Sequence, residues 1–202
     1  MEEEPEYKVI FLGNSGVGKT QLINSVLGDE FDSDSLSTTN ATFFSKYIKI
    51  KKKTYKINLW DTAGQEIYRA ITSLFIKGSC IAIFVYDITD QTSYDDLEFW
   101  IEKAQDILEN NCIYAIVGNK IDLFCDQKVQ EDTAKKLAES KEFYFSQLSA
   151  KAEPQSVKDF IGMLLEKYID KFGEKKGEIK IKINEKKSSK KLHCCSKSRS
   201  SN

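Results

Sequence analysis

Short runs of β-branched and aromatic residues alternate along this chain with segments whose apolar residues recur at helical spacing. Two of the runs, 80–86 and 113–117, are continuously apolar, which is typical of strands buried on both faces of a sheet. Segment 41–51 instead alternates apolar and polar residues, as a half-exposed strand does, and the lysines at 51–53 after it suggest a hairpin. We therefore expect strands over residues 7–12, 41–51, 54–60, 80–86, 113–117 and 143–145.

The helical spacing predicts helices over residues 19–27, 93–108, 132–140 and 157–172, the first of which ends at Gly28. Strands that alternate with helices after one early hairpin indicate an α/β fold. We expect a six-stranded, mostly parallel sheet with one antiparallel edge strand and helices on both faces. Ligands of such sheets bind beyond the carboxyl ends of the strands, and the motifs described below all follow predicted strands.

Composition adds a charge asymmetry to this picture. The 202 residues have a formal net charge of −1, but residues 173–202 contain ten Lys or Arg and three Glu, so this segment carries +7 and the rest −8. Periodicity also stops at 173, and Lys, Ser, Glu and Asn dominate beyond it. We expect an acidic extension over 1–6, one folded domain over 7–172 and a disordered basic tail over 173–202. The tail suits an anionic surface, and the chain as a whole is not expected to bind nucleic acid.

The cysteines indicate a reducing compartment. There are five, an odd number, and those at 80, 112 and 125 match no zinc-binding spacing, which argues against both a disulfide framework and a structural zinc site. The longest apolar run, 80–86, is too short to cross a bilayer. A cytoplasmic protein is the expectation.

Residues 13–20 read GNSGVGKT, a phosphate-binding pattern that lies between a predicted strand and a predicted helix. Glycines let successive backbone N–H groups point at an anion, and the N-terminus of the helix adds its positive dipole end. A lysine there reaches the outer phosphates, and the following hydroxyl binds Mg²⁺. The residues expected to contact phosphate or metal are Gly13, Ser15, Gly16, Val17, Gly18, Lys19 and Thr20.

A second motif, DTAGQ, follows the strand predicted over 54–60. Asp61 is at the end of this strand, the position expected for a carboxylate that helps to bind Mg²⁺. Gly64 can bring its backbone N–H close to a terminal phosphate, since it has no Cβ. Gln65 is the candidate catalytic residue, because its amide both donates and accepts and can orient a water for in-line attack.

Two further motifs point to guanine. In Asn119-Lys120-Ile121-Asp122, the Asp122 carboxylate can accept two hydrogen bonds from the N1–H and amine of guanine, a pair that adenine lacks. Asn119 and Lys120 brace this loop, with the Lys120 stem over the base. Ser149, Ala150 and Lys151 follow the last predicted strand, where the Ala150 N–H can meet the base oxygen.

With these motifs in order over residues 7–172, the chain resembles a Ras-superfamily small GTPase, and most closely the Rab branch. The resemblance implies the P-loop small GTPase fold, binding of GTP or GDP with Mg²⁺, and slow GTP hydrolysis. It further implies an exchange factor, a GTPase-activating protein and effectors as partners, a monomer, and a role in vesicular trafficking. By the family's spacing, Thr38 joins Thr20 and Asp61 as a metal-binding residue and Phe31 flanks the guanine, while Phe43, Trp60 and Phe75 form the effector surface.

The chain departs from the usual Rab pattern beside two of these motifs, with Thr39-Asn40 after Thr38 and Glu66-Ile67-Tyr68 after Gln65. An alternative is therefore a nucleotide-locked interaction module of the same fold that hardly turns GTP over. An ATP-using kinase with the same phosphate loop is disfavoured by the Asn119–Asp122 motif.

The tail contains a cysteine pair, Cys194 and Cys195, seven residues before the last residue of the sequence. Rab proteins carry geranylgeranyl groups on such pairs, usually at or very near the end of the chain. We therefore expect Cys194 and Cys195 to carry two such lipids or to be palmitoylated, and the protein to attach to the cytosolic face of an intracellular membrane. Arg199 occupies the position of the cysteine in a C-a-a-X signal, which excludes that route. Two lipids, or one lipid with basic residues, anchor a protein stably. The alternative is an unmodified, solvated tail.

Overall fold

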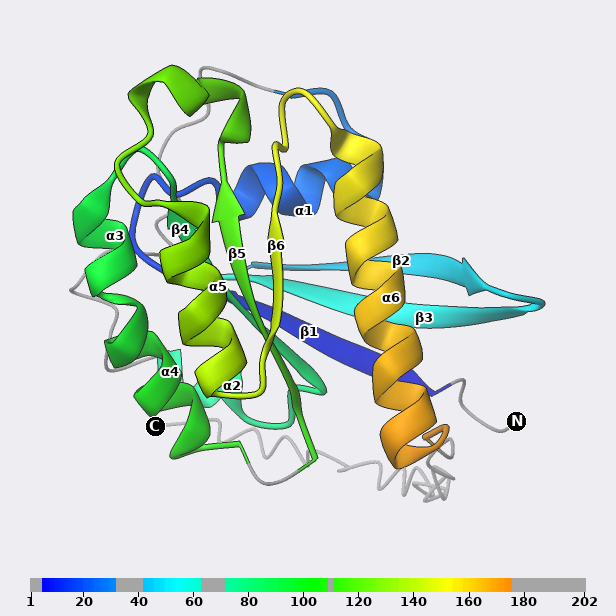
Figure 1. Cartoon of the computed structure of the whole chain (residues 1–202). Coiled ribbons are helices and arrows are strands. Elements are labelled where there is room, and N and C mark those ends of the chain that lie inside the picture. The colour runs from blue at the N-terminus through cyan, green and yellow to red at the C-terminus, as the bar shows by residue number, and fades with distance from the viewer. Residues whose placement is uncertain (1–4, 32–41, 63–71, 109–110, 176–202) are drawn as a thin grey trace, which may run out of the picture.

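The computed structural model describes residues 5–31, 42–62, 72–108 and 111–175, which form a six-stranded sheet covered by helices (Figure 1). The strand order is β2-β3-β1-β4-β5-β6, and every neighbouring pair is parallel except β2 and β3. This confirms the predicted α/β fold with one antiparallel edge strand. The strands are β1 (Glu6–Leu12), β2 (Thr42–Ile50), β3 (Lys53–Asp61), β4 (Ile81–Asp87), β5 (Ile113–Asn119) and β6 (Tyr144–Gln147).

The hydrophobic pattern of a strand matches its position in the sheet. All seven residues of β4 are buried, and the first six form the continuous apolar run expected of a strand at the centre of a parallel sheet. In β2 exposed and half-buried residues alternate, which suits an edge strand with one face in solvent. This confirms the expectation that 80–86 and 113–117 contain interior strands and that 41–51 contains a half-exposed strand.

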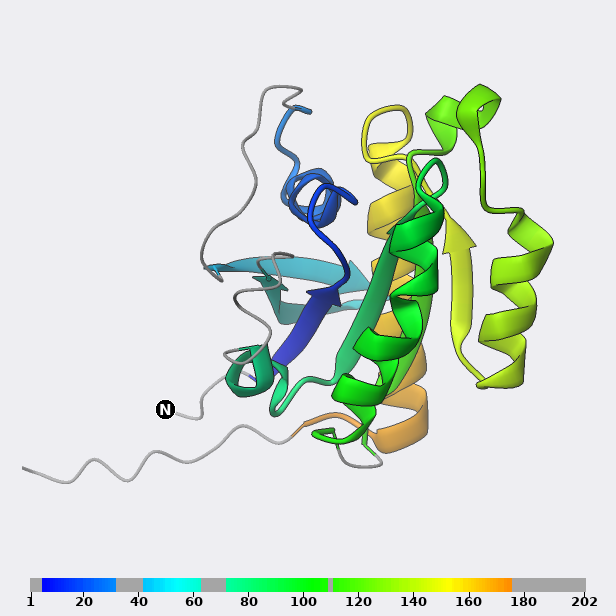
Figure 2. The same cartoon turned by 90° about the vertical axis from the view of Figure 1, so that its left-hand side faces the viewer.

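Helices cover both faces of the sheet and create two apolar cores (Figure 2). On one face α1 and α6 contact each other and contribute the buried Leu22, Ile23, Leu164 and Leu165. On the other face α2, α4 and α5 contribute apolar residues such as Ile76, Trp100 and Ala134, and α3 packs on β4. The helices are α1 (Lys19–Leu27), α2 (Thr72–Ile76), α3 (Gln91–Asp95), α4 (Leu97–Gln105), η2 (Ile121–Asp126, a 3-10 helix), α5 (Glu131–Ser140) and α6 (Pro154–Phe172).

Several boundaries differ from the expectation. The helix predicted over 93–108 is divided at Asp96 into α3 and α4, and its last residues lie outside the helix. Helix α6 begins three residues early at Pro154, because proline fits the first turn of a helix, where no N–H is needed. The short α2 and η2 were not predicted, since five or six residues are too few to show a helical period.

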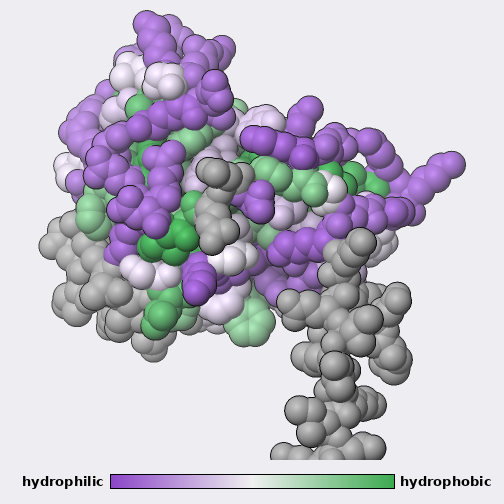
Figure 3. Space-filling model, turned by 90° about the horizontal axis from the view of Figure 1, so that it is seen from below, coloured by the Kyte–Doolittle hydropathy of each residue, from purple (hydrophilic) through white to green (hydrophobic). Residues whose placement is uncertain are grey.

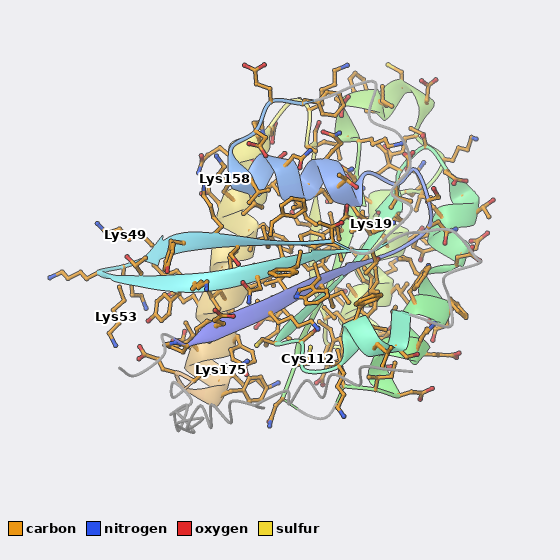
Figure 4. All side chains as sticks on the ribbon, turned by 180° about the vertical axis from the view of Figure 1, so that it is seen from behind. Lys19, Lys49, Lys53, Cys112, Lys158 and Lys175 are labelled. Atoms are coloured by element: carbon orange, nitrogen blue, oxygen red, sulfur yellow. The ribbon has the colours of Figure 1, made fainter. Side chains whose placement is uncertain are left out.

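The parallel strands end at one edge of the sheet, where the loop before α1, the η2 segment and the loop before α6 gather (Figures 1 and 2). The opposite end carries the C-terminus of α6 and residues 173–175, and hydrophilic residues cover much of it (Figure 3). Figure 4 shows Lys19 near the first edge and Lys175 and Cys112 toward the other.

No helix among the described residues has the length and apolar character needed to cross a membrane.

Candidate functional site

The loop between β1 and α1 packs against the neighbouring strands at two glycines. Gly13 has φ 146°, and a Cβ placed there would lie 2.2 Å from the Val85 carbonyl oxygen in β4. Gly18 has φ 92°, and its Cβ would lie 2.3 Å from Nδ2 of Asn119 in β5. Both positions require glycine, because other residues are strained at these angles and would collide with the strand ends. The loop is thus seated on the carboxyl ends of β4 and β5.

Lys19 begins α1 and is 5% exposed. Its Nζ donates to the carbonyl oxygens of Gly13 at 2.9 Å and Asn14 at 2.7 Å. Burial lowers the pKa of Lys19 to about 8, and the charge of Asp61 opposes this shift in part. An ammonium group has three donors, so Lys19 can bond to a phosphate oxygen while keeping contacts to the loop.

Thr20 and Asp61 meet beside Lys19. The Thr20 hydroxyl donates to Oδ2 of Asp61 at 2.7 Å, and Asp61 is buried at the end of β3. The next residue, Thr62, donates from its hydroxyl to the Phe11 carbonyl oxygen at 2.6 Å, which holds the end of β3 against β1. The adjacent side-chain oxygens bring together the ligand types that Mg²⁺ prefers.

The described ranges contain no group of three or more His, Cys, Asp or Glu side chains that could hold a metal ion. Mg²⁺ nevertheless fits Thr20 and Asp61, because it is commonly bound through one or two carboxylates together with substrate phosphates.

Asn119 joins the phosphate loop to the last loop of the domain. Its Nδ2 donates to the Val17 carbonyl oxygen at 2.8 Å, and its Oδ1 accepts from the Ala150 N–H at 3.4 Å. The side chain is almost fully buried at the end of β5. One amide therefore ties together segments that lie more than a hundred residues apart in the sequence.

Ser149 orients Asp122 in the same region. The buried Ser149 hydroxyl donates to Oδ1 of Asp122 at 2.6 Å and accepts from the Ala152 N–H at 2.8 Å. Asp122 itself is half-buried in the first turn of η2. The carboxylate is thus aligned by the loop that follows β6 and keeps oxygen lone pairs for a ligand, since a carboxylate offers about four acceptor sites.

Lys120 and Phe31 complete the cluster. Lys120 has φ 69°, a left-handed conformation that is unusual for a residue with a side chain, and its Nζ forms an ion pair with Oδ2 of Asp87 at 2.7 Å. Nζ of Lys151 lies 5.9 Å from the centre of the exposed Phe31 ring. The predicted base-contacting residues therefore lie in loops that are bonded to one another.

Sequence reasoning missed two residues of this region. Asp87 follows the apolar run of β4 and lies in register with Asn119, so a charge directly after a buried strand was an available signal. Asn14 occupies a variable position of the phosphate-loop pattern, yet its side chain bonds to Asp96 and Trp100. No sequence signal marks Asn14, because its partners are more than eighty residues away.

Two of the predicted effector residues, Phe43 and Phe75, each contact the third, Trp60. The rings of Phe43 and Trp60 are stacked at 5.2 Å, and those of Trp60 and Phe75 lie 5.7 Å apart. Phe43 is 55% exposed, and the Nζ of Lys8 lies 4.2 Å from the centre of the Trp60 ring. The triad thus forms an aromatic surface at the open end of the β2–β3 hairpin.

Several predicted site residues lie outside the described part of the chain, and their roles stay predictions: Thr38, Gly64, Gln65, Cys194 and Cys195.

Comparison with known proteins identifies the family. The model of the Ras family matches residues 8–170. Ras-related protein rab-11.1 of Caenorhabditis elegans is 38% identical over 162 residues, which cover 80% of this chain and 77% of the relative. Ras-related protein RGP2 of Oryza sativa subsp. japonica is 40% identical over 144 residues (71% and 66%), and Ras-related protein RABA6a of Arabidopsis thaliana is 40% identical over 151 residues (74% and 65%).

The matches therefore span about two thirds to three quarters of these relatives. The chain belongs to the Ras family. Within the Ras superfamily it is a Rab-like small GTPase, a class of enzymes that hydrolyse GTP to GDP and phosphate.

Proposed function

We propose that this protein is a GTP-binding molecular switch that hydrolyses GTP slowly with Mg²⁺ and regulates vesicular membrane trafficking. The observation that carries the proposal is the pair of hydrogen bonds made by Asn119 to Val17 and Ala150. They bring the phosphate loop and the two loops with guanine-type motifs into one site. Such a site suits a ligand that has both a phosphate chain and a purine base.

At the phosphate end, backbone N–H groups of residues 13–18 and the ammonium of Lys19 bind the β- and γ-phosphates. Thr20, Asp61 and the predicted Thr38 hold Mg²⁺, which neutralises phosphate charge when it is bound. The contacts of Lys19 with two loop carbonyls support this role, because they keep the ammonium at the loop where the phosphates lie.

At the base end, Asp122 accepts the two donors on the guanine edge while Ser149 holds its carboxylate in place. The Ala150 N–H meets the base oxygen, and Lys120, Lys151 and Phe31 flank the base. A purine without those donors leaves Asp122 unpaired, so GTP and GDP are preferred over adenine nucleotides.

For hydrolysis, Gln65 orients the attacking water. The segment from Phe31 to Phe43 contains no arginine that could stabilise the transition state from within the chain. Intrinsic hydrolysis is therefore slow, and a GTPase-activating protein that supplies an arginine raises the rate by roughly 10³–10⁵.

Switching follows from the γ-phosphate. With GTP bound, contacts of the γ-phosphate with Thr38 and with Gly64 order the two flanking segments, and hydrolysis releases them. Effectors read this change next to the aromatic surface of Phe43, Trp60 and Phe75, and an exchange factor reverses it by releasing GDP. The trafficking role rests on the Rab likeness of the relatives.

Membrane attachment through residues 173–202 completes the proposal. Lipids on Cys194 and Cys195, together with basic residues worth about 1 kcal/mol each near an anionic leaflet, hold a monomer on the cytosolic face of an intracellular membrane. Mass spectrometry of the tail from native cells tests this part, and unmodified cysteines would contradict it.

Single-turnover GTP hydrolysis tests the switch. The wild-type protein is compared with Gln65→Leu, which replaces the amide by an apolar side chain of similar size. We expect GTP hydrolysis to be at least about tenfold slower in the variant, because holding the attacking water in position contributes at least this factor to the rate. Equal rates would instead support the nucleotide-locked module.

Competition of GTP against ATP for binding to the wild-type protein tests base recognition. We expect GTP to win by a factor of roughly 10² or more, because the wrong base leaves buried polar groups unpaired. Equal affinities would contradict the assignment of Asp122.

A further inference from the structure

The side chain of Asn14, in the phosphate loop, is held at both of its polar atoms by another part of the chain. Nε1 of Trp100 donates to Oδ1 of Asn14 at 3.0 Å, and Nδ2 of Asn14 donates to Oδ2 of Asp96 at 2.7 Å. Trp100 is completely buried in α4, and Asp96 lies between α3 and α4. The loop is therefore attached to the α3–α4 junction through one amide.

The chemistry of the partners selects an amide at this position. An indole N–H can only donate, and an ionised carboxylate can only accept. A side chain between Trp100 and Asp96 must accept from the first and donate to the second, and the amide of Asn14 does both. The same reasoning fixes which end of the amide faces each partner.

The backbone of Asn14 takes part in the phosphate end of the site. Its carbonyl oxygen accepts from Nζ of Lys19 at 2.7 Å, and the preceding Gly13 packs on the Val85 carbonyl. A displacement of Asn14 thus moves a group that bonds directly to the Lys19 ammonium. The side chain of Asn14 acts on nucleotide through this backbone and does not need to touch the ligand.

Helix α3 extends the connection to the base end. The Asp96 N–H bonds to the Thr92 carbonyl oxygen at 3.0 Å, which places Asp96 on the last turn of α3. In the same helix the buried Ser93 hydroxyl accepts from the Asp87 N–H at 3.0 Å. Asp87 in turn holds Lys120 of the base loop. Helix α3 is therefore linked to Asp96, which bonds to the phosphate loop, and to Asp87, which holds the base loop.

We propose that Asn14 is a positioning residue for the phosphate loop and that the α3–α4 junction, through Asp96 and Trp100, holds the loop in its nucleotide-binding shape. The inference rests on the proposed function, because it concerns retention of the same nucleotide. It adds a support from the α3–α4 junction to the glycine contacts that the loop makes with β4 and β5.

Release of a fluorescent GDP analogue from the loaded full-length protein tests the proposal. Asn14→Asp places a carboxylate against Asp96, and like charges at this spacing repel. We expect GDP release to become about tenfold faster, which corresponds to a modest loss of binding free energy. Trp100→Phe replaces the buried indole by a smaller ring without the N–H donor, and we expect release at least about threefold faster, the loss of one neutral hydrogen bond together with some packing.

The exchanged pair Asn14→Asp with Asp96→Asn is the decisive variant. It restores a donor and an acceptor in the reverse order, and the carboxylate at position 14 still accepts from Trp100. We expect GDP release from the exchanged pair to return to within about threefold of the wild-type rate. The single variant Asp96→Asn is measured as well, because it completes the double-mutant cycle. A purely structural defect at position 14 would not be repaired by a second substitution on α3–α4.

Each result decides the matter. Wild-type protein that fails to bind GDP contradicts the proposed function, whatever the variants do. Wild-type protein that binds GDP, with Asn14→Asp releasing it equally slowly, overturns the present inference alone, as does an exchanged pair that releases GDP as fast as Asn14→Asp. If Asn14→Asp does not fold, as judged by circular dichroism, the exchanged pair decides: folding with near-normal release supports the proposal, and failure to fold overturns it.

Discussion

The two ends of the sheet hold their charged residues in different ways. At the carboxyl end Lys19, Asp61 and Asp87 are buried, and each is engaged by short bonds to backbone or side-chain partners. At the opposite end the ion pairs Lys51–Glu166 and Lys53–Glu174 lie at the surface. Since burial of a charge is costly and surface pairs add little, the buried set indicates a ligand site and the exposed set does not.

The comparison teaches that polar residues at the two ends contribute to different properties. Those at the carboxyl end are buried at a cost in folding free energy, which is expected if they serve the proposed nucleotide site. Those at the other end face water, where side-chain entropy and screening nearly cancel their attraction. Substitutions at the first end should therefore change nucleotide binding strongly, and those at the second should change very little.

The largest effect is expected for Lys19→Met. This variant keeps the length of the side chain but removes the charge that is proposed to bind the phosphates. We expect affinity for GTP and GDP to fall by about 10³-fold or more, because loss of one partner of a buried charge pair costs several kcal/mol. Titration with a fluorescent guanine nucleotide measures it, and Lys158→Met on α6 is a control that should keep the wild-type affinity.

The pKa of Lys19, lowered to about 8, adds a prediction about stability without nucleotide. Between pH 8 and 10.5 the unfolded chain binds more protons at this lysine than the folded chain does, so its contribution makes folding more favourable as pH rises. We expect the free energy of unfolding of the wild type to rise relative to Lys19→Met by about 3 kcal/mol over this interval. Denaturant unfolding at several pH values measures the difference, and parallel curves for the two proteins would contradict it.

Asp122→Ala sharpens the comparison within the carboxyl end. Loss of two hydrogen bonds to a charged acceptor should weaken GTP binding by about 10²-fold and leave ATP binding unchanged. The exposed Asp126, at the other end of η2, provides the matched control Asp126→Ala. Competition between the two nucleotides measures the effect, and an unaltered preference for GTP would show that the carboxylate does not read the base.

Gly13→Ala should lower folding stability, since the new Cβ would meet a backbone carbonyl at 2.2 Å. We expect a loss of about 3 kcal/mol, the upper range for overpacking, and a melting midpoint lower by roughly 6–12 °C. Gly162→Ala in α6 is the matched control, because nothing lies within 4 Å of its Cβ and alanine favours a helix. Equal midpoints for the two variants would contradict the close packing at Gly13.

The smallest effect is expected for Glu174→Ala. This residue pairs with Lys53 at 2.7 Å and accepts from the Tyr55 hydroxyl at 2.9 Å, yet its side chain is exposed at the surface. We expect no measurable change in either the melting midpoint or the affinity for guanine nucleotide. A clear loss of either would mean that the two ends of the sheet are not as different as their burial suggests.

Much of the fold was predictable because its hydrophobic pattern is local. The apolar run of β4, the alternation in β2 and the apolar stripe of α6 can each be recognised along the chain. The division of α3 from α4 at Asp96 was not predictable, since helical spacing continues across it. At this division Asp96 accepts a hydrogen bond from Asn14 of the phosphate loop, a tertiary contact that helical spacing does not show.

The candidate site likewise contains residues that the sequence predicted and residues that only the structure revealed. Spacing alone marked Lys19, Asp61, Asn119 and Asp122, because phosphate and guanine chemistry requires particular residue types directly after strands. Only the folded chain revealed that Asp87 holds Lys120 and that Trp100 holds Asn14. The sequence by itself thus determined which groups can meet a nucleotide, since that depends on their chemistry. The tertiary structure decided what holds those groups in place, because the supporting bonds join residues that are neighbours in space and not along the chain.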